Sequence, residues 1–288
     1  MAELEYGKEK EEEHVPENMG ILSISQSASP LRSSLSEVEY DLKYSLPSNV
    51  MFLLGSSCSV ALSVIDLRWN AKWGDDDYYY WEYYYAHPEL FVSAARSLFP
   101  WFSWYYFLSI GGAILFILNA GIDLFRCHRI SKIEEISIFD KNLRGDTYAA
   151  ILFGMAATLD LRGSLISSSE SGGIDGFMWL LSSHLYLFSA LSTLSSMNYR
   201  CGSIPLSLNL IGDILFMIAT LIDVSISYIS DPDIVFETQH VLLRFGLLSS
   251  VLWLLDAILY IAANVIVLCM TKQKNDAVGR IISTSLVV

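Results

Sequence analysis

After residue 49, long apolar stretches alternate with short polar segments along the chain. Six stretches are long enough to cross the roughly 30 Å hydrocarbon core of a bilayer, which takes about 20 helical residues. Lipid offers a backbone no hydrogen-bond partners, so each stretch is expected to be an α-helix. The predicted spans are 50–67, 104–125, 147–166, 177–197, 205–229 and 241–270. The pattern therefore predicts an all-α membrane protein with about six transmembrane helices.

Composition supports this class and excludes others. Hydrophobic residues make up 53% of the 288 residues and charged residues only 17%, with a mean hydropathy of +0.41. Soluble domains usually carry about 25% charged residues. The net charge of −13 argues against nucleic-acid partners, which attract basic surfaces. We therefore expect the lipid bilayer, and no nucleic acid, as the main partner.

The two ends of the chain differ from its centre. Residues 1–49 are acidic, rich in Ser and poor in aromatic residues, so we expect a disordered acidic tail. Residues 271–288 are expected to form a second, short tail. With the N-terminus inside, thirteen of the 18 Lys and Arg residues fall on the inner side. The positive-inside rule then predicts that both termini are cytoplasmic, and it does not identify the membrane.

Three spans share one spacing of Gly and Asp. The pairs, each eleven residues apart, are Gly55 and Asp66, Gly112 and Asp123, and Gly212 and Asp223. Eleven residues are close to three helical turns, so both residues of a pair lie on nearly the same helix face. The Gly lets a neighbouring helix approach closely. The spacing indicates either a duplicated helix unit, as in transporters, or a coincidence of residues common in spans.

The second span carries this pattern within the segment SIGGAILFILNAGIDLF, residues 109–125. With its neighbouring spans, it resembles the YrhK-like family of membrane helix-pair proteins. The resemblance covers the spans only. It implies paired membrane helices, and because that family has no characterised activity it implies no site residues.

The predicted outer loop, residues 68–103, is rich in Tyr and Trp and includes the run YYYWEYYY. Such rings favour the headgroup layer of a bilayer, which predicts an aromatic anchor. Tyr-rich surfaces also bind partners with little loss of entropy, which predicts a recognition surface. The sequence leaves both interpretations open.

Sequence motifs give no sign of catalysis. The chain has no Walker loop, HExxH, GxSxG or dinucleotide fingerprint, and its five His are scattered. We therefore expect no enzyme, no metal centre and no cofactor. Three classes of function remain: a conduit, which would assemble as a homo-oligomer, a non-transporting membrane scaffold, and a receptor-like sensor that uses the aromatic loop.

Acidic residues within the predicted spans are the candidate functional site. An Asp at the centre of a span costs about 2.5–3.5 kcal/mol on insertion scales, so it needs a partner or a function. We predict that four residues line one outward-opening cavity that handles H⁺ or a metal cation: Asp160, His184, Asp223 and Asp256. The alternative is that neutral Asp side chains join helices by hydrogen bonds.

Overall fold

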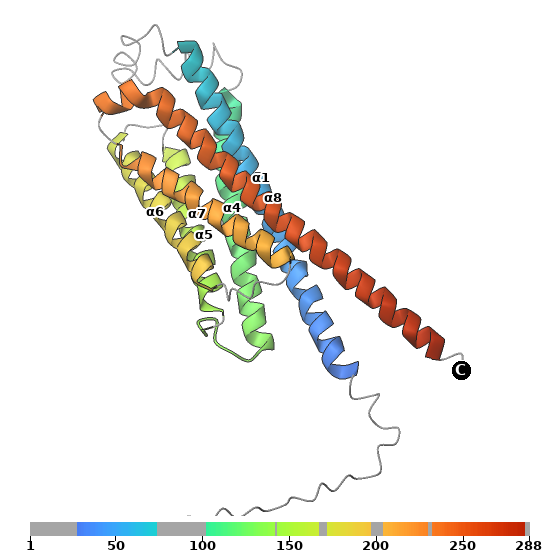
Figure 1. Cartoon of the computed structure of the whole chain (residues 1–288). Helices are drawn as coiled ribbons and strands as arrows, with labels where there is room; N and C mark the ends of the chain where they lie inside the picture. Colours follow the sequence, from blue (N-terminus) through green and yellow to red (C-terminus); the bar gives the residue numbers. More distant parts are fainter. Residues whose placement is uncertain are drawn as a thin grey trace, which may run out of the picture.

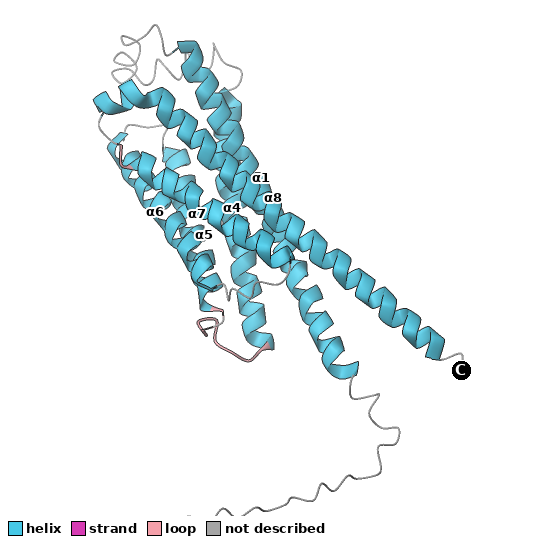
Figure 2. Cartoon of the chain, in the orientation of Figure 1, coloured by secondary structure: helices cyan, strands magenta, loops and turns pink. Residues whose placement is uncertain are grey.

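The computed structural model of the chain describes residues 28–73, 102–141, 143–166, 172–196, 204–229 and 232–285. Residues 1–27 of the predicted tail and most of the aromatic loop lie outside these ranges. Within them the backbone is helical apart from short connections, the longest between α4 and α5 (Figure 2). The helices are α1 (Ala28–Trp73), α4 (Phe102–Ile133), α5 (Arg144–Ile166), α6 (Gly172–Ser196), α7 (Ile204–Ser227) and α8 (Pro232–Ser285).

Two helices extend beyond the predicted spans. Helix α1 begins at Ala28, so residues 28–49, which the sequence assigns to a disordered tail, are helical. The last residues of this extension pack inside the bundle, where Ser48 is buried and accepts a hydrogen bond from Asn119 on α4. Helix α8 continues to Ser285, so the predicted C-terminal tail is also largely helical.

The six described helices form a closed ring. Each helix contacts the helices before and after it in the chain, and α1 contacts α8. The N-terminal end of α1 and the C-terminal end of α8 lie at the same end of the bundle (Figure 1). Because an even number of helices with alternating directions returns the chain to its starting side, the ring explains this placement.

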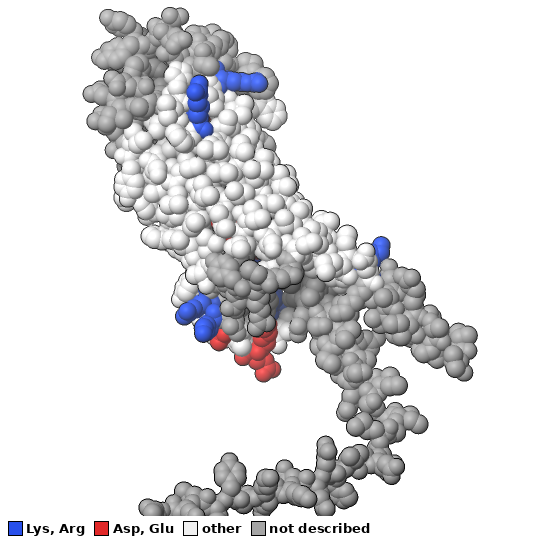
Figure 3. Space-filling model, viewed as in Figure 1, with Lys and Arg blue, Asp and Glu red and all other residues white. Residues whose placement is uncertain are grey.

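Many large apolar side chains are exposed on the outer surface of the ring. Figure 3 shows the coloured Lys, Arg, Asp and Glu side chains near the ends of the bundle, with a long white surface between them. Five helices contain segments long and apolar enough to cross a membrane, as a multi-pass membrane protein requires. These segments are Leu42–Arg68, Phe107–Ile133, Phe177–Ser195, Ile204–Ser227 and His240–Gln273. Helix α5, the predicted third span, is not among them, because Asp160 and Arg162 interrupt its apolar stretch.

Candidate functional site

A layer of six aromatic side chains fills the centre of the ring, one from each helix. Each is only 5–7% exposed, and the contacting rings lie 4.9–6.1 Å apart between centroids. In chain order they are Phe52, Phe116, Phe153, Tyr186, Phe216 and Trp253. Aromatic pairs at such separations pack favourably. The layer therefore closes the axis of the bundle near its middle.

Two polar cavities lie on either side of this aromatic layer. The tail-side cavity, at the end that holds the N-terminal end of α1, has a volume of about 360 Å³ and is lined by all six helices. The far-side cavity, at the opposite end, has a volume of about 150 Å³. Neighbouring helices run in opposite directions. The tail-side cavity is therefore lined by residues that precede the aromatic residue in α1, α5 and α7. The residues from α4, α6 and α8 that line it follow their aromatic residue.

The far-side cavity combines two carboxylates with several hydroxyl groups. Tyr186 Oη donates a hydrogen bond to Asp160 Oδ2 at 2.7 Å. Asp223 lines the same cavity as Asp160, together with Ser249 and Trp253. No Lys, Arg or His is among the described residues that line this cavity. Its lining is therefore suited to a cation.

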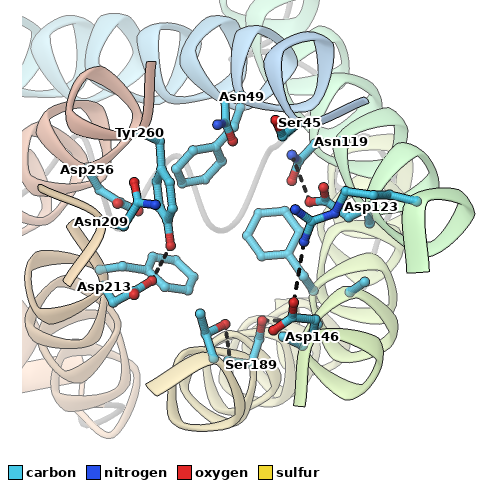
Figure 4. A pocket seen from close by; sticks show the side chains of 18 of the residues that line it. Ser45, Asn49, Asn119, Asp123, Asp146, Ser189, Asn209, Asp213, Asp256 and Tyr260 are labelled. Carbon is cyan, nitrogen blue, oxygen red and sulfur yellow. Dashed lines mark hydrogen bonds and ion pairs between the residues drawn. The ribbon is translucent and has the colours of Figure 1, made fainter. Parts of the chain in front are cut away.

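The tail-side cavity is larger and more acidic. Its described polar lining includes four Asp, four Asn and one Arg: Asp123, Asp146, Asp213, Asp256, Asn49, Asn119, Asn209, Asn264 and Arg126. Figure 4 shows Asp213, Asp256, Asn209 and Tyr260 together on one side and Asp123 and Asp146 on the other. Arg126 Nη2 lies 3.4 Å from Asp146 Oδ2 in an ion pair. This lining also carries a net negative charge.

The structure divides the four predicted site residues. Asp160 and Asp223 line the far-side cavity together, whereas Asp256 lines the tail-side cavity with Asp213. The reason is direction: Asp256 follows its aromatic residue by three positions on α8, and the other two follow theirs by seven on helices that run the opposite way. The single cavity of the sequence hypothesis is thus two cavities.

His184 lines neither cavity. Its Nδ1 lies 2.7 Å from the Leu180 carbonyl oxygen and its Nε2 lies 3.0 Å from Tyr228 Oη. Leu180 belongs to α6, the helix of His184 itself, and Tyr228 is the residue that follows α7. The imidazole is therefore placed in a structural contact rather than beside the acids.

The glycines of the Gly–Asp pairs lie where helices touch. A Cβ on Gly55 would stand 2.5 Å from the Phe116 ring, and one on Gly112 would stand 3.2 Å from Cys58 Cβ. A Cβ on Gly212 would stand 2.5 Å from Asp256 Oδ1. Gly112 and Gly212 each precede their aromatic residue by four positions, but Gly55 follows Phe52 by three. The pairs in α4 and α7 therefore share one register, and the pair in α1 does not.

The sequence contains a second repeat, which differs from the Gly–Asp spacing and occurs in all six described helices. Each helix has a nine-residue segment with Leu or Met just before the aromatic residue and small or polar residues at both ends. The segments are SNVMFLLGS (48–56), GAILFILNA (112–120), AAILFGMAA (149–157), SSHLYLFSA (182–190), GDILFMIAT (212–220) and SSVLWLLDA (249–257). In all six, the aromatic and the last two residues are buried and the seventh is exposed. Alignment on the aromatic residue, not on Gly and Asp, would have identified the layer.

Comparison of the chain with protein-family models, curated proteins and solved structures gives no match. The resemblance to YrhK-like helix pairs therefore stays a prediction.

Proposed function

We propose that the protein is a membrane conduit, either a channel or a proton- or cation-coupled transporter, that uses buried Asp residues. One arrangement carries the proposal: two acidic cavities lie on the axis of a closed helical ring, and one aromatic layer separates them. Rings of acidic side chains favour cations, and apolar constrictions close a path by excluding water. The aromatic layer is the closed part of this path.

The proposal includes α5 as a sixth span. Its 23 residues are about 35 Å long at about 1.5 Å per residue, enough to cross the hydrocarbon core. Helix α5 packs between α4 and α6, and Asp160 faces the far-side cavity rather than lipid. Six spans also agree with two chain ends at one end of the bundle (Figure 1). The distribution of Lys and Arg supports the cytoplasm as the side of that end.

The axis of a single ring supplies the path, so the proposal needs no homo-oligomer. This differs from the expectation based on the number of spans alone. The charges along the path favour a cation over an anion, because the lining contains six Asp and a single Arg that is paired with Asp146.

A scaffold is the second candidate, and hydrogen bonds between helices favour it. Tyr186 joins α6 to Asp160 on α5, and Tyr260 joins α8 to Asp213 on α7. Such bonds contribute to helix association in membranes. The sensor interpretation depends on the aromatic loop, which lies outside the described residues apart from its helical ends, and it stays a prediction.

Flux measurements on the purified chain in liposomes separate these candidates. We expect H⁺ or cation flux in the wild-type protein and a loss of at least tenfold in the Asp223→Asn, Asp256→Asn double variant. Asn preserves size and hydrogen bonding but cannot carry charge. His184→Gln is the control and should retain flux, because His184 faces neither cavity. Absence of flux in the wild type, or full flux in the double variant, would contradict the conduit and favour the scaffold.

A further inference from the structure

Two pairs of polar side chains face one another between α7 and α8 on the tail side of the aromatic layer. Asn209 and Asp213 are one turn apart on α7, and Asp256 and Tyr260 are one turn apart on α8. Both Asp side chains are only 1% exposed, yet both line the tail-side cavity. Figure 4 shows the four side chains gathered on the same side of that cavity.

Three oxygen atoms of this group have no hydrogen-bond partner among the described residues. They are Asn209 Oδ1, Asp213 Oδ2 and Asp256 Oδ1. Buried polar atoms in folded proteins almost always have a partner, and an unpartnered buried carboxylate oxygen is especially costly. Arg126, which also lines this cavity, forms its ion pair with Asp146 on the other side. Among the described residues, none of the three oxygens therefore receives a hydrogen bond.

The far-side acids do not share this deficit. Asp160 accepts a hydrogen bond from Tyr186 and lies beside Ser182. Asp223 lies beside Ser249 and Trp253. Of the six Asp that line the two cavities, Asp213 and Asp256 are the ones with a buried oxygen that has no partner among the described residues.

The chemistry of the group points to a hard cation. Its donors are carboxylate, amide and phenol oxygens, which suit Na⁺, K⁺, Mg²⁺ and Ca²⁺, whereas transition metals favour His and Cys. No set of three His, Cys, Asp or Glu able to hold a metal occurs in the described part of the chain. Tyr260 donates to Asp213 Oδ1 and so holds the carboxylate with its other oxygen available. The cavity of about 360 Å³ leaves room for waters to complete the coordination.

We propose that Asp213, Asp256 and Asn209 form a binding site for a hard metal cation between α7 and α8, reached from the tail-side cavity. The inference rests on the proposed conduit and deepens it, since it names the class of ion and a binding position for that ion on the tail side of the aromatic layer. Gly212 belongs to the site because its missing side chain leaves the space that the Asp256 carboxylate occupies.

Thermal unfolding of the purified full-length chain in detergent tests the site. A ligand that binds the folded state raises the unfolding temperature with its concentration. Choline chloride is replaced stepwise by NaCl, KCl, MgCl₂ or CaCl₂ at constant ionic strength. We expect a saturable rise with at least one of the four salts. Asp213→Asn and Asp256→Asn should each weaken the apparent affinity at least tenfold, and Asn209→Ala several-fold without removing any charge.

Asp66→Asn is the control, because Asp66 is a half-buried Asp on a helix that lies beside Tyr105 and outside both cavities. This variant should keep the wild-type response. No response of the wild type to any of the four salts, or an unchanged affinity in Asn209→Ala and in whichever Asp variants fold, would overturn the inference. Saturable binding without flux in liposomes would leave the site standing and end the conduit proposal. Flux in liposomes without any change in Tm would support the conduit proposal and end the proposal of this binding site.

Discussion

Single residues in this bundle serve packing and chemistry at once. Gly212 lets α8 approach α7, and the Asp256 carboxylate lies against it. The aromatic residues likewise fill the core and separate the two cavities. Substitutions at such positions are therefore expected to alter both stability and function. Matched substitutions elsewhere should leave stability and function unchanged.

Gly212→Ala is the sharpest case. Its new Cβ would stand 2.5 Å from Asp256 Oδ1, so the carboxylate or the helix must move. We expect a loss of about 1–3 kcal/mol, which is typical of overpacking, measured by unfolding in detergent. The control is Gly246→Ala on α8, where a Cβ would meet nothing within 4 Å. That variant should be neutral or gain up to about 1 kcal/mol from helix propensity. Equal stability of the two variants would contradict the close contact.

Trp253→Ala tests the aromatic layer. Trp253 contacts rings from all the other five helices, and its removal would join the two cavities. We expect a loss of about 3–5 kcal/mol in stability and a raised proton leak in liposomes. Trp104→Ala, at a position that is 58% exposed on the outside, should leave the leak unchanged. A Trp253→Ala protein that is folded and as tight as wild type would show that the layer is not the barrier.

At the scale of helices, α5 is the element whose role is most open to test. If α5 spans the membrane, the connections before and after it lie on opposite sides. In a variant without native Cys, single Cys residues at Asp140 and Ser168 should then react with an impermeant thiol reagent from opposite sides of sealed vesicles. Labelling of both positions from one side would show that α5 does not cross.

The long first helix makes a second prediction at this scale. Removal of residues 1–27 should change the unfolding temperature little, since the sequence there is acidic and has few apolar residues to bury. Removal of residues 1–45 takes away Leu42 and Ser45, which are buried in the bundle. We expect the longer deletion to cost about 2–5 kcal/mol, as for other buried Leu side chains. Equal stability of the two truncated chains would mean that this extension packs without effect.

The helices themselves could be predicted from sequence because their apolar stretches are long, and five of the six predicted spans match apolar helices. Depth along a span also follows from the sequence, since the helical rise is fixed: Asp160 and Asp223 each follow their aromatic residue by seven positions and line the same cavity. The direction in which a side chain points could not be predicted. His184 and Asp256 look alike as polar residues within spans, but only Asp256 faces the axis. Contact between α1 and α8 joins distant parts of the chain and leaves no local signal.

At the scale of the whole molecule, the bundle is a ring of six similar elements with alternating directions. A nine-residue segment of the same pattern lies in each described helix. The six aromatic residues therefore fall at one level, although three of the helices run antiparallel to the other three. The small residues around each aromatic residue leave space above and below it, and that space is what the two cavities occupy. One local pattern, repeated, thus builds both the barrier and its two polar approaches.

The thinness of the aromatic layer has an electrical consequence. Asp256 lies only three residues from Trp253, about 4.5 Å along the helix, and Asp223 lies seven residues from Phe216, about 10.5 Å. Water in both cavities would extend the conducting solution toward the layer from either side, so most of the transmembrane voltage would fall across the aromatic rings. A charge that moves between the two groups of acids then crosses nearly the full voltage, worth about 2.3 kcal/mol per 100 mV. The layer would thus focus the field of the whole membrane onto one ring of side chains.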